Sequence, residues 1–85
     1  MSYVKNDPET EQFIQSLEEP QREIYLFMRK EYDILTEQGE HFDEAKNDEY
    51  VEQKASEHFD ISSEEAGNVF AKTESQIRSF QNYKI

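Results

Sequence analysis

Apolar residues recur at helical spacing between residues 20 and 38. The main stripe follows intervals of four, four and three residues and consists of Ile24, Met28, Tyr32 and Leu35. Three more apolar residues lie outside the stripe and widen it: Tyr25, Phe27 and Ile34. This pattern predicts an α-helix that is covered on two sides, because its apolar surface exceeds a single stripe. Gly39 is predicted to end the helix, since glycine readily adopts the left-handed conformation that closes a last turn.

A shorter helix is predicted ahead of this one. Asp7 can accept backbone N–H groups as an N-cap, and Pro8 suits the first helical position. The apolar face of this helix consists of Phe13, Ile14 and Leu17. Pro20 then interrupts the pattern, because proline has no N–H for the helical ladder and clashes with the preceding turn. We expect the helix either to kink at Pro20 or to restart with Pro20 in its first turn.

Two further helices are predicted in the second half of the chain. Asn47 or Asp48 can cap the third helix, whose apolar face consists of Val51, Ala55 and Phe59. The fourth helix is expected to start at Ser62 or Ser63, and Ser62 with Glu65 has the spacing of a capping box. Its apolar residues recur at four, three, four and three: Ala66, Phe70, Thr73, Ile77 and Phe80. This seam is too short for a coiled coil by itself and serves equally as the core face of a bundle helix.

The chain is therefore predicted to be all-α, a small three- to four-helix bundle with a kinked N-terminal helix followed by a helical hairpin. Its 85 residues make one domain, expected over residues 8–81 between a flexible N-terminus (1–7) and a flexible tail (82–85). An apolar share of 34% and a net charge of −11 favour disorder. Six Phe, five Tyr and only two Gly and two Pro favour a folded domain with an aromatic core, and we expect the folded state.

The hairpin has the outline of a helix-turn-helix, but its chemistry does not suit DNA. Phe59 and Asp60 stand in the turn where glycine is usual. The first turn of the would-be recognition helix carries Glu64 and Glu65, and a DNA-binding helix needs basic residues there. We expect a helix-turn-helix-like hairpin that serves as a scaffold and makes no direct contact with nucleic acid.

The acid excess predicts which partners are attracted. Twenty Asp and Glu face nine Lys and Arg, so nucleic acids and anionic membranes are repelled and a basic protein is attracted. Carboxylates along helices can also imitate a phosphate lattice, which makes an inhibitor or nucleic-acid mimic that blocks a basic cleft an alternative function. The candidate acidic face consists of Glu44, Asp48, Glu49 and Glu52. The simplest reading of such a charge run is a solvated surface.

No pattern indicates an enzyme, a cofactor or a metal site. There is no Cys, and the two glycines form no phosphate-binding loop. Neither His stands three residues after a Glu, as carboxylate-bridged metal bundles require. The first residues carry no apolar run and no stretch is long enough for a membrane span, so we expect no signal peptide and a cytoplasmic protein.

The function that fits best is a non-enzymatic protein–protein interaction module or regulator. Self-association, as a homodimer, is expected through the wide apolar face of the second helix, because two short helices cannot cover it. The predicted partner-binding residues are Tyr25, Phe27, Tyr32, Ile34 and Gly67. A glycine inside a helix costs about 1 kcal/mol relative to Ala. Gly67 therefore marks either the close approach of another helix or an unoptimised exposed position.

Overall fold

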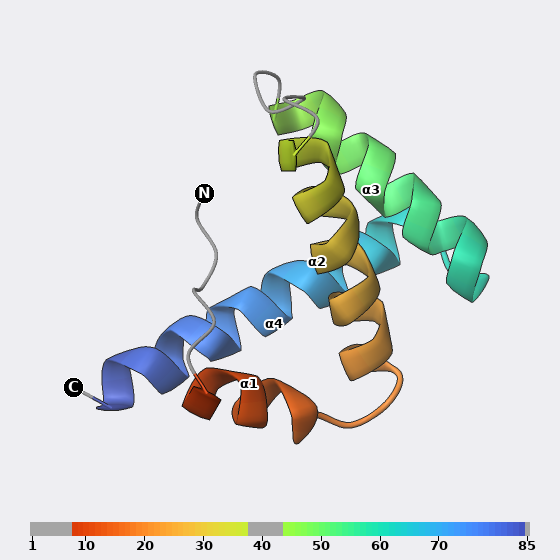
Figure 1. Ribbon diagram of the computed structural model, residues 1–85. Coiled ribbons are helices and arrows are strands. Elements are labelled where there is room, and N and C mark those ends of the chain that lie inside the picture. Colours follow the sequence, from red (N-terminus) through yellow and green to blue (C-terminus); the bar gives the residue numbers. More distant parts are fainter. Residues whose placement is uncertain (1–7, 38–43, 85) are drawn as a thin grey trace.

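The computed structural model describes residues 8–37 and 44–84, which form four helices and no strand. The helices are α1 (Pro8–Gln15), α2 (Gln21–Glu37), α3 (Glu44–Phe59) and α4 (Ser63–Lys84). The long α4 lies along the base of the fold: α1 runs beside its C-terminal half, α2 crosses it, and α3 packs near its N-terminal end (Figure 1). The prediction of a small all-α bundle is confirmed.

The junction between α1 and α2 is a restart of the helix at Pro20. Residues 16–20 leave the helical path, and the carbonyl of Pro20 accepts the N–H of Ile24 at 3.0 Å. Pro20 thus stands just before the first turn of α2, where its missing N–H removes no helical hydrogen bond. The N-cap predicted at Asp7 and the helix end predicted at Gly39 lie outside the described residues. So does the predicted flexible N-terminus, whereas α4 continues to Lys84, past residue 81.

The connection between α3 and α4 is closed by local backbone and side-chain hydrogen bonds. Asp60 adopts the left-handed conformation, with φ of 58°, and the N–H of Ile61 bonds back to the carbonyl of Ser56 at 3.1 Å. This is the hydrogen bond of a Schellman helix end, with Asp in the position that glycine usually occupies. Ser62 then caps α4, since its hydroxyl accepts the N–H of Glu65 at 3.0 Å. The predicted start of the fourth helix at Ser62 is confirmed.

The third helix begins earlier in the chain than predicted. We expected Asn47 or Asp48 as the N-cap, but α3 already begins at Glu44. The Asp48 carboxylate instead accepts a hydrogen bond from the Tyr32 hydroxyl of α2 at 2.8 Å. Glu and Ala at positions 44 and 45 are good helix formers, so the helix can extend beyond the residues that looked like caps.

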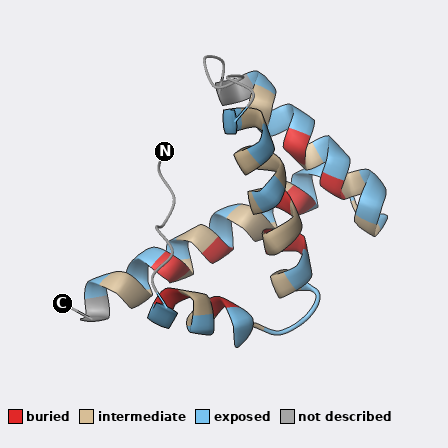
Figure 2. Cartoon of the chain, in the orientation of Figure 1, coloured by how far each residue is buried: buried red, intermediate tan, exposed pale blue. Residues whose placement is uncertain are grey.

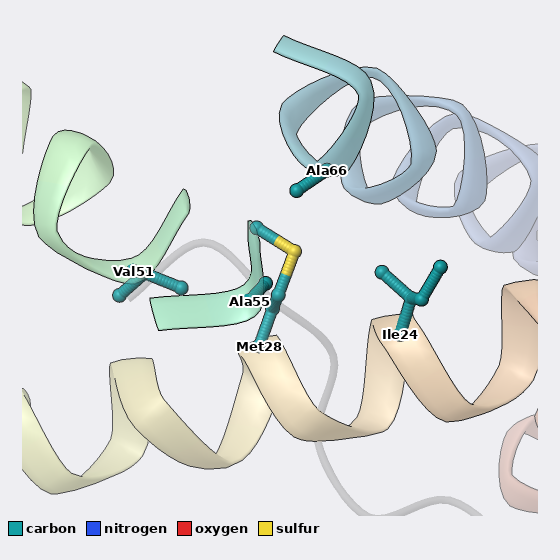
Figure 3. Close-up of a cluster of buried hydrophobic side chains, with 5 residues drawn as sticks. All are labelled: Ile24, Met28, Val51, Ala55 and Ala66. Atoms are coloured by element: carbon teal, nitrogen blue, oxygen red, sulfur yellow. The ribbon is translucent and has the colours of Figure 1, made fainter. Parts of the chain in front are cut away.

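The interior consists of two clusters of buried side chains, visible as red bands on the inner faces of the helices (Figure 2). The larger one joins α2, α3 and α4 through Ile24, Met28, Val51, Ala55 and Ala66. Ile24 and Met28 point from α2 toward Ala66 of α4, and Met28 also lies beside Ala55 (Figure 3). The smaller cluster joins α1, α2 and α4 through Ile14, Tyr25 and Ile77.

Phe70 on α4 connects the two clusters. It packs against both, and its ring centroid lies 5.0 Å from that of Tyr25 and 5.0 Å from that of Tyr32. The two tyrosines are seven residues apart on α2, so they stand two turns apart on one side of that helix. Phe70 therefore fixes α2 across α4 and gives the fold a continuous aromatic row.

Candidate interaction surface

The predicted partner-binding residues of α2 fall on two different sides of the helix. Tyr25 and Tyr32 pack against Phe70 of α4, whereas Phe27 stacks on His58 of α3. Ile34, seven residues after Phe27, is on the Phe27 side of α2 and is exposed. Tyr25 has no exposed surface at all and belongs to the smaller core cluster. A partner can therefore reach Phe27 and Ile34 without unfolding the chain, but it cannot reach Tyr25.

Both inward-facing tyrosines donate a hydrogen bond to a carboxylate on a neighbouring helix. The Tyr25 hydroxyl donates to Glu74 of α4 at 2.7 Å, and the Tyr32 hydroxyl donates to Asp48 of α3 at 2.8 Å. Burial raises the pKa of each phenol above its ordinary value, and the hydrogen bond and negative charge of the carboxylate raise it further. The tyrosines are thus held in the neutral form and join α2 to α4 and α3.

The other edge of the α2–α3 pair carries aromatic rings in contact. Phe27 of α2 stacks on His58 of α3, with ring centroids 4.5 Å apart, and meets the ring of Phe59 edge-on at 5.4 Å. His58 itself is exposed. Ile34 and Tyr50 are the large hydrophobic residues that the described part of the chain leaves exposed, at 36% and 47%.

The register of the α2–α3 pair relates the positions of these residues. Two contacts set the register of the pair: Phe27 meets His58, and Tyr32, further along α2, meets Asp48, earlier in α3. The two helices are therefore antiparallel, so Ile34 lies opposite the N-terminal turns of α3, which contain Tyr50. Ile34 is seven residues from Phe27 and Tyr50 is eight from His58, which places each pair on one side of its helix. We call Phe27, Ile34, Tyr50 and His58 the α2–α3 edge.

Gly67 has a neighbour within its own chain. A Cβ atom built on Gly67 would stand 2.6 Å from Oε2 of Glu52, which reaches across from α3. The absence of a side chain at position 67 thus makes room for a carboxylate, and the approaching group is a side chain of α3. The close approach of another backbone, expected at this glycine, stays a prediction.

The predicted acidic face is divided by these contacts. Asp48 holds the Tyr32 hydroxyl, Glu52 lies against Gly67, and Glu49 is exposed, while the side chain of Glu44 lies outside the described residues. Partial burial raises the pKa of Glu52, and the negative charges of Asp48 and Glu49 raise it further. Of the predicted acidic face, Glu52 therefore lies against α4, Asp48 is bonded to α2, and Glu49 stays exposed.

Sequence reasoning did not select Tyr50 and His58 for the partner surface. The signal was present, because Tyr50, Lys54 and His58 follow at intervals of four residues and share one side of a helix. The Lys54 ammonium lies over the Tyr50 ring, 5.8 Å from its centroid. A single aromatic beside a lysine does not stand out in a helix of low hydrophobicity, and only the exposure of Tyr50 in the folded chain makes it a candidate.

Within residues 8–37 and 44–84, no group of three or more His, Asp or Glu side chains is placed to hold a metal ion. No helix in these ranges is both long and apolar enough to cross a membrane. Comparison with known proteins found no matching family model, no matching curated protein and no matching solved structure.

Proposed function

We propose that this protein is a non-enzymatic interaction module that associates with a second copy of itself through the α2–α3 edge. The observation that carries the proposal is the exposure of Ile34 and Tyr50 on the two helices that the Phe27–His58 stack joins. Large aromatic side chains are common anchors of protein interfaces.

Local charge supports a second copy as the partner. A net charge of −11 opposes contact between two copies over most of their surface. At the α2–α3 edge, however, lysines accompany the apolar residues: Lys54 lies over Tyr50, and Lys30 is three residues from Phe27 and four from Ile34. The acidic Glu31 is on the same helix, four residues from Phe27 and three from Ile34. Two copies related by a two-fold axis can therefore pair acids with lysines around an apolar centre.

The test is the oligomeric state of the full chain and of an Ile34→Ser/Tyr50→Ser variant, measured by sedimentation equilibrium over a wide concentration range. Both residues are exposed, so their replacement leaves the core intact and the helical circular dichroism should not change. We expect the wild type to dimerise and the variant to stay monomeric. A matched control neutralises Asp48, Glu49 and Glu52 to Asn and Gln and should still dimerise. A wild type that remains monomeric at high concentration would refute self-association.

The alternative is an acidic inhibitor that blocks a basic cleft of a nucleic-acid-binding protein. Its support is the concentration of negative charge on α3, where Asp48 and Glu49 raise the pKa of Glu52. Capture of partners from nuclease-treated lysate, with elution by rising salt, separates the two ideas. A basic partner that leaves at moderate salt, and that the acid-neutralised control does not retain, favours the inhibitor, because surface charge pairing is screened within about 10 Å at 0.1 M salt.

A further inference from the structure

Helix α1 packs against α2 and the C-terminal half of α4 (Figure 1). We call the site that Tyr25, Ile77 and Phe80 form around its apolar side chains the groove. Ile14 of α1 fills the groove without exposed surface, packed with Tyr25 of α2 and Ile77 of α4. Phe13 extends the contact by stacking on Phe80, with ring centroids 4.7 Å apart. The groove therefore accepts an amphipathic helix that presents two adjacent apolar residues.

Two arginines of α2 contact α1. The Arg29 guanidinium pairs with Glu11 of α1, with Nη1 3.3 Å from Oε2. The Arg22 guanidinium donates to the carbonyl of Gln15 at 2.9 Å, at the C-terminal end of α1, and also pairs with Glu19. Two of the chain's three arginines thus hold α1, which carries Glu9 and Glu11 and no basic residue. The ion pair between Arg29 and Glu11 therefore favours an acidic residue at this position of the bound helix.

Helix α1 is also the element that the fold can release most easily. It has eight residues, too few for a stable helix without its tertiary contacts. Its fully buried residues are Thr10 and Ile14, and none of the buried residues in the α2–α3–α4 cluster comes from it. Opening of α1 therefore leaves the larger cluster in place and exposes Tyr25 and Ile77 between two arginines.

We propose that α1 is a releasable strap over a helix-binding groove, and that the groove receives a short acidic amphipathic helix of a partner protein. The tethered α1 competes with this helix at a high effective concentration, so the groove is closed until the partner helix displaces α1. This site is separate from the α2–α3 edge, and its occupation does not depend on self-association there.

The direct test uses a fluorescein-labelled peptide with the sequence of residues 7–18 as the probe and measures fluorescence anisotropy. The Ile14→Asp variant of the full chain should bind the peptide saturably, because its own strap no longer fits the groove. The affinity of the wild type for the peptide should be lower by about tenfold or more, because the tethered α1 competes. Adding Arg29→Gln to the Ile14→Asp chain should weaken binding, whereas adding Lys54→Gln on α3 should not. Absence of binding to the Ile14→Asp chain, equal binding to both chains, or equal binding of a peptide that itself carries Ile14→Asp would overturn the proposal.

Hydrogen exchange of the wild-type chain gives a second measurement that needs no substitution. Ile14 in α1 and Ile77 in α4 have no exposed surface and belong to the same cluster. If α1 opens by itself, the amide of Ile14 should exchange about tenfold faster or more than that of Ile77, after correction for intrinsic rates. Equal protection of the two amides would mean that α1 opens only when the whole molecule unfolds, which contradicts a releasable strap.

Discussion

The carboxylate of Glu52 on α3 lies against Gly67 on α4, so closely that a Cβ atom at position 67 would stand 2.6 Å from Glu52 Oε2. The contact involves the far end of a flexible side chain, since the distance from this Cβ position increases to 3.0 Å at Glu52 Cδ and 3.5 Å at Glu52 Cγ. Glu52 can therefore move aside without a shift of either backbone. A small side chain at position 67 should therefore meet little steric resistance, and its substitution should mainly report the free-energy cost of a glycine in a helix.

Gly67→Ala is expected to stabilise the protein slightly. Alanine gains about 1 kcal/mol over glycine within a helix, and displacement of the Glu52 carboxylate into solvent takes back only part of that gain. We expect a net increase of about 0.5 kcal/mol in the free energy of unfolding, measured by urea denaturation. The bulkier Gly67→Val should lose this advantage, because its branched side chain also loses rotamer freedom in a helix. Destabilisation by Gly67→Ala would show that the backbones, and not the Glu52 side chain, set the spacing.

Glu52→Gln is expected to stabilise the fold at pH 7 by roughly 0.2–1 kcal/mol, the range of exposed charge interactions. Partial burial, with Asp48 and Glu49, raises the pKa of Glu52 in the folded state above its ordinary value of 4.5. At pH values above the folded-state pKa, the ionised Glu52 carboxylate therefore lowers the free energy of unfolding. This penalty disappears as the pH falls from the folded-state pKa to the ordinary value of 4.5. Urea titrations at several pH values should show a flatter pH dependence for Glu52→Gln than for the wild type. Glu18→Gln, at an exposed residue between α1 and α2, serves as the control for a general loss of negative charge.

At alkaline pH, two of the five tyrosines should resist ionisation. Burial and the carboxylates of Glu74 and Asp48 raise the folded-state pKa of Tyr25 and Tyr32 above the ordinary value of 10.0. Their contribution to stability is complete below that value and is lost as the pH rises toward the folded-state pKa. Absorbance at 295 nm should therefore show a late phase that coincides with loss of helical circular dichroism. Tyr32→Phe should halve the amplitude of that phase, and titration of every tyrosine near pH 10 in the folded chain would contradict the structure.

Phe70→Ala is expected to be severely destabilising, by about 3 kcal/mol, because it removes a ring that packs against both core clusters. The adjacent Val69 packs against only the larger cluster, and Val69→Ala should cost about 1 kcal/mol by the same kind of measurement. Near-ultraviolet circular dichroism should also change for Phe70→Ala, since Tyr25 and Tyr32 both lose their stacking partner. Equal effects of the two substitutions would mean that Phe70 does not connect the clusters.

Much of the architecture could be predicted because helix formation leaves local signals. The Ser62–Glu65 spacing predicted the cap of α4, and Pro20 predicted the interruption before α2. The stripe of Ile24 and Met28 predicted a helix face in the larger core cluster. The start of α3 was misplaced because Asp48 resembles a cap, whereas its carboxylate bonds Tyr32 on another helix. A capping side chain and a cross-helix acceptor cannot be told apart without the position of the donor.

The sequence by itself therefore determined the helical class, the acidic charge, the helix start at Ser62 and the apolar faces, because each follows from residues a few positions apart. Only the tertiary structure decided which neighbour covers each side of α2. It buried Tyr25 against Phe70, left Ile34 exposed and filled the space above Gly67 with Glu52. The physical reason is that helical periodicity specifies which side chains share a face, while the crossing of one helix over another specifies what that face meets.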